Sequence, residues 1–316
     1  MARPNLLLCF DAFGTLFKPK RSIAQQYSEV AATCGLTGIK VDDVQTAFRA
    51  AFKDESKSNP NYGKVTGLGA TKWWENVIHK TFEPLVGHGK ALPAHLAPRL
   101  LQRFASIQGY DLEPTLASSL KALRLLDPGP KSLYHRIVIG VVTNSDDRVP
   151  GILSSSGLKI SPLRYGTHNQ KDVPNDKNEY DVDFHCMSYD VGVEKPDKLM
   201  FSAAELLLAR ILATRDGKSR DEAQAEGQIW RKIYVGDEYA KDVVGASNAG
   251  WNPVLLDAED QVPDIPKLQN SAVKSLDGFF GKHPVAKFCS APCELFLAKF
   301  KAMMRVYLDI AEKRLA

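Results

Sequence analysis

The sequence predicts an α/β fold in which a doubly wound parallel sheet carries a helical insertion. Three observations predict it: short apolar runs are spaced along the chain, each ends in a small polar cluster, and a long helical block separates the first run from the second. With 316 residues, 44% hydrophobic and 25% charged, the chain has the size and composition of a globular protein of one or two domains.

The apolar runs are interpreted as strands whose carboxyl ends carry polar residues. The predicted strands and the residues that follow them are Leu6 to Phe10 before Asp11 and Gly14-Thr15, Ile137 to Val142 before Thr143-Asn144-Ser145, Ile233 to Val235 before Gly236-Asp237, and Asn252 to Leu256 before Asp257. Ligands of such sheets bind outside the carboxyl ends of the strands. The polar clusters therefore predict the position of a functional site.

Between these strands the pattern is helical from Arg21 to Leu126, with Gly, Pro and Asn at the expected turns. Residues 162–183 are polar and lack periodicity, which predicts a surface excursion. We expect an α/β core of residues 1–17 and 118–264, a helical unit of residues 18–117, and a carboxyl-terminal extension of residues 265–316 that includes an amphipathic helix.

Charge and cysteine content restrict the partners and the compartment. The formal net charge is +4, from 41 basic and 37 acidic residues, so neither nucleic acid nor a membrane surface is an expected partner. The first apolar run is too short for a signal peptide. Five scattered cysteines without metal-ligand spacing are typical of reduced thiols, which favours a cytoplasmic or nuclear location. The sequence does not specify an oligomeric state.

The first two polar clusters offer a nucleophile and an anion site. In FDAFGTLF, the carboxylate of Asp11 at a strand end can attack an electrophile, while backbone N–H groups of the Gly14-Thr15 turn hold an anion. In VVTNSDDR, Thr143 and Asn144 add a hydroxyl and an amide beside that nucleophile. An Asp before a turn can equally be a structural cap, and Thr-Asn-Ser can be an ordinary loop.

Two later motifs supply a cation and a pair of carboxylates. Lys195 of GVEKPDKLMF can neutralise both the nucleophile and a transferred group, although a solvated surface lysine is the alternative. Asp237 and Asp242 of GDEYAKD form an oxygen site suited to Mg²⁺, with structural caps as the alternative.

Taken in order, Asp-x-x-Gly-Thr, Thr-Asn, Lys-Pro and Gly-Asp-x-x-x-x-Asp resemble the motifs of the haloacid dehalogenase-like hydrolases, from about Leu6 to Asp257. The resemblance implies a Rossmann-like core with an inserted C1-type helical cap. The segments SIAQQYSEVAATCGL and TKWWENVIHKTF are similar to the eukaryotic "haloacid dehalogenase-like hydrolase domain-containing" group, which is related to a rhythmically expressed fly protein.

The resemblance also implies a reaction on a small phosphorylated metabolite. Asp11 would form an aspartyl-phosphate, which water then hydrolyses, with Thr143 and Lys195 as the other catalytic residues. The implied substrate-binding residues are Gly14, Thr15, Thr143, Asn144 and Lys195. The implied Mg²⁺ ligands are Asp11, the backbone carbonyl of Phe13, Asp237 and Asp242.

One position departs from the pattern of the phosphatases in this superfamily. They usually carry a second Asp two places after the nucleophile as general acid and base, and here that place is Phe13. Losing such a group typically removes a factor of about 10²–10⁴ in rate. Three interpretations stay open: a weak or specialised phosphatase, a non-catalytic relative that binds a partner, and a metal-independent 2-haloacid dehalogenase.

The sequence does not name the substrate, but it offers candidate pocket residues. Trp73 and Trp74 are adjacent in a predicted helix and therefore point in different directions. We expect at least one of them in the helical core, which leaves the other available to shape a substrate pocket.

Overall fold

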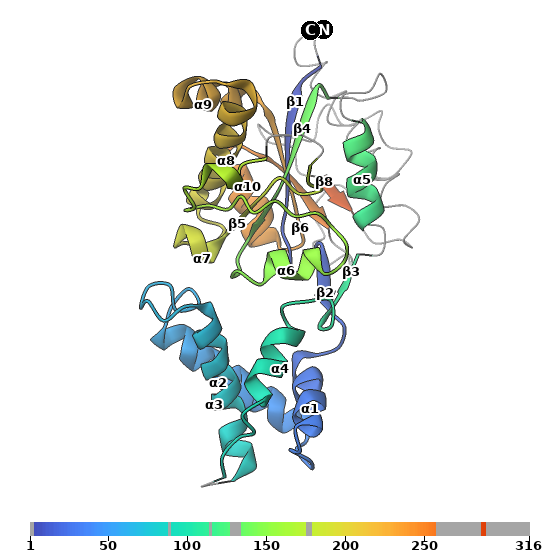
Figure 1. Cartoon of the computed structure of the whole chain (residues 1–316), viewed down its shortest axis with the longest axis vertical. Coiled ribbons are helices and arrows are strands. Elements are labelled where there is room, and N and C mark those ends of the chain that lie inside the picture. The colour runs from blue at the N-terminus through green and yellow to red at the C-terminus, as the bar shows by residue number, and fades with distance from the viewer. Residues whose placement is uncertain are drawn as a thin grey trace.

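The computed structural model describes residues 3–87, 90–113, 116–126, 134–174, 179–256 and 286–288. A parallel sheet of six strands in the order β5-β4-β1-β6-β7-β8 lies at one end of the molecule, and a helical unit lies at the other (Figure 1). The strands are β1 Asn5–Phe10, β4 Arg136–Thr143, β5 Phe184–Met187, β6 Arg231–Gly236, β7 Asn252–Leu256 and β8 Ala286–Phe288.

Strand β1 occupies the point where the sheet changes its direction of growth. The chain passes from β1 outward to β4 and β5, and then returns to β6 on the other side of β1. Phe10, the last residue of β1, is in register with Val141 of β4 and with Val235 of β6, and these two strands end shortly beyond, at Thr143 and Gly236. Such a reversal opens a crevice at the carboxyl ends of the strands. Asp11 is the first residue beyond β1 at that crevice.

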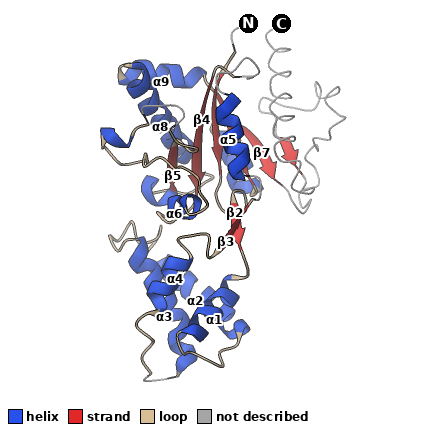
Figure 2. Ribbon diagram, turned by 45° about the vertical axis from the view of Figure 1, so that its right-hand side comes forward, coloured by secondary structure: helices blue, strands red, loops and turns tan. Residues whose placement is uncertain are grey.

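Helices cover both faces of the sheet, with α5 and α6 on one side and α8 to α10 on the other (Figures 1 and 2). These are α5 Leu116–Leu126, α6 Val149–Ser154, α7 Ser188–Val191, α8 Lys198–Asp216, α9 Arg220–Ile229 and α10 Val244–Asn248, with one turn of 3₁₀ helix at Gln170–Asp172 and one of π helix at Tyr239–Val243. A sheet covered on both faces needs apolar side chains at every strand position, which explains the continuous apolar runs.

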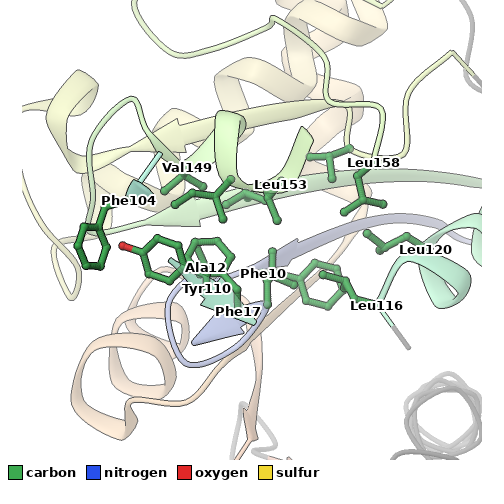
Figure 3. Packing of buried hydrophobic residues seen from close by; sticks show 14 of the residues in the cluster. Phe10, Ala12, Phe17, Phe104, Tyr110, Leu116, Leu120, Val149, Leu153 and Leu158 are labelled. Atoms are coloured by element: carbon green, nitrogen blue, oxygen red, sulfur yellow. The ribbon is translucent and has the colours of Figure 1, made fainter. Parts of the chain in front are cut away.

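Alternate residues of β1 therefore enter two different cores. Leu8 and Phe10 pack into the cluster that includes α5 and α6, part of which is drawn in Figure 3, whereas Leu7 and Cys9 pack against α8. Burying one such side chain stabilises the fold by about 1.5–3 kcal/mol.

The helical unit consists of α1 Ile23–Thr33, α2 Val41–Ser58, α3 Ala70–Val86 and α4 Leu96–Arg103. A two-stranded antiparallel ribbon, β2 Phe17–Pro19 with β3 Tyr110–Leu112, joins it to the sheet. Helix α1 begins where the Ser22 side chain accepts a hydrogen bond from the backbone N–H of Gln25. The predicted fold, an α/β core with an inserted helical cap, is confirmed.

Some details differ from the sequence-based expectations. Strand β5 was not predicted, and within the predicted surface excursion Leu163 and Val173 are buried against the sheet. Most of the predicted carboxyl-terminal extension, with its amphipathic helix, lies outside the described residues, apart from β8, which pairs with β7. Among the helices that the structure describes, none combines the length and apolarity needed to span a membrane.

Candidate active site

The four motifs converge at the carboxyl edge of the sheet. The ammonium of Lys195 lies 2.8 Å from Oδ1 of Asp11 and 2.7 Å from Oδ1 of Asp242, although 184 and 47 residues separate these partners in the chain. The hydroxyl of Thr15 donates to Oδ1 of Asp237 at 3.1 Å. Asp11, Lys195 and Asp242 are all buried. The predicted nucleophile, cation and carboxylate pair therefore form one cluster.

The three carboxylates of Asp11, Asp237 and Asp242 each place an oxygen within 4.8 Å of the others. Burial, together with the charges of Asp11 and Asp242, raises the pKa of Asp237 to about 6. Burial also raises the pKa of Asp242, even though Lys195 opposes the shift. Crowded carboxyl oxygens of this kind are the ligands that hard divalent cations such as Mg²⁺ prefer.

Two glycines permit this crowding. Gly14 has a φ of +81°, and a Cβ there would lie 2.1 Å from Oδ2 of Asp237. At Gly236 a Cβ would lie 2.2 Å from Oδ2 of Asp242. A side chain at either position would displace a carboxylate. The sequence predicted Gly14 as part of an anion-binding turn. The structure shows that Gly14 also leaves the space that the carboxylate of Asp237 occupies.

Lys195 uses its three N–H donors within the cluster, because its ammonium also lies 2.7 Å from the hydroxyl of Tyr234. Burial alone would lower the pKa of Lys195, but Asp11 and Asp242 outweigh burial and raise that pKa. The lysine is therefore charged and held in a fixed position beside Asp11.

Sequence reasoning did not identify Tyr234. Its hydroxyl donates to the carbonyl of Val142 at 2.7 Å and accepts from Lys195. Burial raises the pKa of Tyr234 well above its usual value, so the hydroxyl keeps its proton. The signal in the sequence was a phenol between the aliphatic Ile233 and Val235, since a buried hydroxyl usually needs a partner.

Asn144 holds the backbone of Lys195 through both atoms of its side-chain amide. Its Oδ1 accepts from the N–H of Lys195 at 2.7 Å, and its Nδ2 donates to the carbonyl of Lys195 at 3.0 Å. Thr143 lies beside it at the end of β4 and is buried. Asp11, Thr143, Asn144 and Lys195 all line the same cavity. Their individual roles, and that of the Phe13 carbonyl, stay predictions.

The cavity has a volume of about 330 Å³, and residues of both the sheet edge and the helical unit line it. Its floor, contributed by the sheet edge, contains Asp11, Thr143, Asn144 and Lys195. Aromatic rings from the ribbon and from the helices form its opposite side, which we call the roof. Phe13 lines the cavity next to Asp11. The structure separates the adjacent tryptophans as expected: Trp73 is buried in the helical core, and Trp74 lines the cavity.

A contact between the helical unit and the core closes one side of the cavity. The indole Nε1 of Trp74 donates to Oδ2 of Asp146 at 2.6 Å. Arg148 donates to both oxygens of the same carboxylate, at 2.8 and 3.0 Å, and its guanidinium lies 4.0 Å from the centre of a Trp74 ring. Burial alone would raise the pKa of Asp146, but Arg148 and Trp74 together lower it. Asp146 and Arg148 follow the Thr-Asn motif in the chain and were not among the predicted site residues.

Comparison with known proteins identifies the family. The chain is 30% identical over 260 residues to the zebrafish (Danio rerio) haloacid dehalogenase-like hydrolase domain-containing protein 3, covering 82% of this chain and 88% of that protein. It is 24% identical over 257 residues to the Drosophila melanogaster rhythmically expressed gene 2 protein, covering 79% of this chain and 82% of that protein. No protein-family profile matches the sequence.

Solved structures with a similar arrangement include a defluorinating L-2-haloacid dehalogenase, with 12% identity, a TM-score of 0.49 and coverage of 95% of this chain and 99% of that one. They also include a haloacid dehalogenase-type phosphatase from Thermococcus onnurineus, with 17% identity, a TM-score of 0.43 and coverage of 96% and 98%. On the strength of the zebrafish relative, this chain belongs to the haloacid dehalogenase-like hydrolases.

Proposed function

We propose that this hydrolase is a Mg²⁺-dependent phosphatase that acts on a small phosphorylated metabolite through a phosphorylated Asp11. One observation carries the proposal: the Asp11 carboxylate lines a cavity while lying beside two further carboxylates and a buried ammonium. Because Oδ1 of Asp11 accepts from Lys195, Oδ2 is the oxygen left for attack.

The residues present fit a divalent cation. Three carboxylates share a small volume, and burial together with the charges of Asp11 and Asp242 raises the pKa of Asp237 to about 6, so a bound cation would relieve their repulsion. Asp11 and Asp237 would hold Mg²⁺, with Asp242 and the backbone carbonyl of Phe13 in support. When bound, the ion supplies positive charge that stabilises a phosphoryl group during transfer.

The reaction has two displacements at phosphorus. Oδ2 of Asp11 bonds to phosphorus while the bond from phosphorus to the leaving oxygen breaks, and that oxygen takes the electron pair. A water oxygen then attacks phosphorus, the bond to Asp11 breaks, and the proton lost by the water goes to solvent. Lys195 compensates the charge near Oδ1 throughout, and Thr143 and Asn144 hold phosphoryl oxygens.

Phe13 restricts the leaving group. Its ring packs edge-on against Phe17, with centroids 4.7 Å apart, and against Tyr110 at 5.6 Å, so hydrocarbon occupies the place of the usual proton donor. A leaving oxygen receives no proton from this position. Acyl or aryl phosphates, whose leaving groups are weakly basic, are therefore better substrates than sugar phosphates.

The test compares acetyl phosphate, 4-nitrophenyl phosphate and glucose 6-phosphate, each with Mg²⁺ and with excess chelator. We expect the first two to be hydrolysed faster, and all activity to disappear with chelator. Intact-mass analysis after acid quenching should show one added phosphoryl group on the wild type. Equal rates for the three substrates would contradict the leaving-group argument, and activity in chelator would exclude the metal dependence.

A second candidate is a metal-independent dehalogenase, which the phenyl ring of Phe13 and the apolar roof favour, because a halide leaves without a proton. It predicts chloride release from 2-chloropropionate in excess chelator. A non-catalytic binding protein predicts instead that no substrate turns over and that Asp11→Asn preserves the cellular function.

A further inference from the structure

We propose that the leaving group of the substrate is aromatic, so that the enzyme hydrolyses phosphate monoesters of small phenol-type alcohols. This inference rests on the proposed phosphatase function and deepens it. Its basis is a continuous arc of aromatic rings that begins beside the nucleophile and extends across the roof of the cavity.

The first part of the arc comes from the nucleophile loop, the ribbon and the carboxyl end of α4. The Phe13 ring lies 5.6 Å from Tyr110, and Tyr110 lies 5.8 Å from Phe104, measured between ring centroids. All three residues line the cavity, and Phe13 is two residues from Asp11. A ring attached directly to the transferred phosphate would therefore meet aromatic surface at once.

The second part comes from the helical unit. The Tyr27 ring lies 5.5 Å from Phe104 and 5.2 Å from Phe48, Phe48 lies 6.0 Å from Phe52, and Phe52 lies 5.9 Å from Trp74. These spacings fall within the range in which aromatic rings attract one another. A planar ligand inserted along the arc could make the same edge and face contacts.

The roof offers little to a leaving group rich in hydroxyls. Among the described residues that the helical unit and the ribbon contribute to the lining, none carries a charge. Trp74 already donates to Asp146, and the charge of Arg148 on the core side is matched by the same carboxylate. The polar side-chain atoms of this lining are the hydroxyls of Tyr27, Tyr62 and Tyr110 and the indole N–H of Trp74, so the roof presents mainly aromatic carbon and few groups that replace the hydrogen bonds of a sugar to water.

Size and chemistry agree with a single small ring. A volume of about 330 Å³ lies at the low end for ligand pockets, which typically hold about 300–1,000 Å³. When Oδ2 of Asp11 bonds to phosphorus, the bond from phosphorus to the phenolic oxygen breaks and the electron pair passes to that oxygen. The ring delocalises the charge, and the phenolate takes its proton from water afterwards. The lack of a general acid at position 13 then lowers the rate of the reaction only slightly.

The test measures binding to the full-length protein in Mg²⁺ by calorimetry, with phenylphosphonate and methylphosphonate as probes. Both carry the same anionic group and neither has an ester bond to hydrolyse, so the ratio of their Kd values reports the contribution of the ring. We expect phenylphosphonate to bind at least about tenfold more tightly. The double variant Phe48→Leu/Phe52→Leu should reduce the ratio to about twofold, because it keeps apolar volume but removes two rings.

Controls separate recognition from folding. Val65→Ala changes a residue of the helical unit that is 69% exposed and does not line the cavity, and it should leave the ratio unchanged. Thermal melts establish that each variant folds. Phe52 is 36% exposed, so Phe52→Leu alone is the second variant should the double variant unfold, and it should lower the ratio about threefold.

The outcomes distinguish the two proposals. Equal affinities for the two phosphonates, with acetyl phosphate still hydrolysed in Mg²⁺, would overturn the aromatic leaving group and leave the phosphatase standing. Tight binding of phenylphosphonate, with neither acetyl phosphate nor 4-nitrophenyl phosphate hydrolysed, would support aromatic recognition and overturn the phosphatase.

Discussion

The sheet and the helical unit contribute opposite kinds of surface to the cavity between them. On the floor, charged and hydroxyl groups are joined by hydrogen bonds of 2.7 to 2.8 Å from Lys195. In the roof, rings meet at centroid distances of 5.2 to 6.0 Å. The floor depends on fixed charges and the roof on shape and apolar contact. Under the proposed function, the reaction chemistry would belong to the sheet edge and substrate selection to the helical unit.

The largest expected effect is a change to the floor. Asp11→Asn removes the attacking carboxylate oxygen, and hydrolysis of 4-nitrophenyl phosphate should fall by at least about 10³-fold. Phosphate release measures the rate, and the added phosphoryl group should be missing from the intact mass. If the variant kept more than a tenth of the wild-type rate, Asp11 would not be the nucleophile.

Lys195→Met tests whether the positive charge of Lys195 stabilises the neighbouring carboxylates of the floor. It leaves Asp11 and Asp242 facing one another without their cation, which should lower the free energy of unfolding by about 3–5 kcal/mol at pH 8. Because burial raises the pKa of Asp242, this carboxylate binds a proton at a higher pH in the folded protein than in the unfolded chain. The loss of unfolding free energy should therefore become smaller as the pH falls from 8 to 5. Urea unfolding at both pH values measures it.

The matched control for that experiment lies in the roof. Phe52→Leu changes apolar contacts alone, and its cost in unfolding free energy should be the same at pH 5 and pH 8. A pH-independent loss in Lys195→Met would contradict the comparison between the two surfaces.

Phe13→Asp changes the point where floor and roof meet. A carboxyl group there could protonate the leaving oxygen, so kcat/KM for glucose 6-phosphate should rise by about 10–100-fold, up to the lower end of the usual contribution of a general acid. Phe13→Asn is the control, since the Asn side chain has nearly the same shape as that of Asp but cannot donate a proton as an acid. An equal rise in both variants would attribute the effect to space and not to proton transfer.

The smallest effect concerns the contact between the two parts. Trp74→Phe keeps a ring in the roof but removes the N–H that binds Asp146, at a cost of about 1 kcal/mol. The KM for 4-nitrophenyl phosphate should rise about fivefold, with kcat changing less than twofold. A fall in kcat at constant KM would instead connect this contact to the chemical step.

Much of the fold was predictable because the sheet is buried on both faces. Strands β1, β4, β6 and β7 all coincide with apolar runs that the sequence displays. Strand β5 has only four residues, includes His185, and follows a polar segment. Its burial results from packing against β4 and α8, which no local pattern records.

The site, like the fold, was predictable from the sequence only in part. Asp11, Lys195, Asp237 and Asp242 stand at fixed distances from strand ends or motifs, so their convergence was predictable from sequence order. The role of Tyr234 depends on the side chain of Lys195 reaching across the sheet. The ring arc depends on how four helices and a ribbon close over the sheet edge, and neither composition nor periodicity specifies that closure.

The narrow ribbon of β2 and β3 has a consequence for engineering. The chain leaves the core at Phe17 and returns at Leu112, and these two residues are paired directly across the ribbon. Because the two points at which the chain enters and leaves the helical unit are adjacent, the whole unit is an insertion with neighbouring ends. If the proposed function holds, replacing the insert by the corresponding insert of a relative should alter which phosphate esters are hydrolysed, while the sheet keeps its fold.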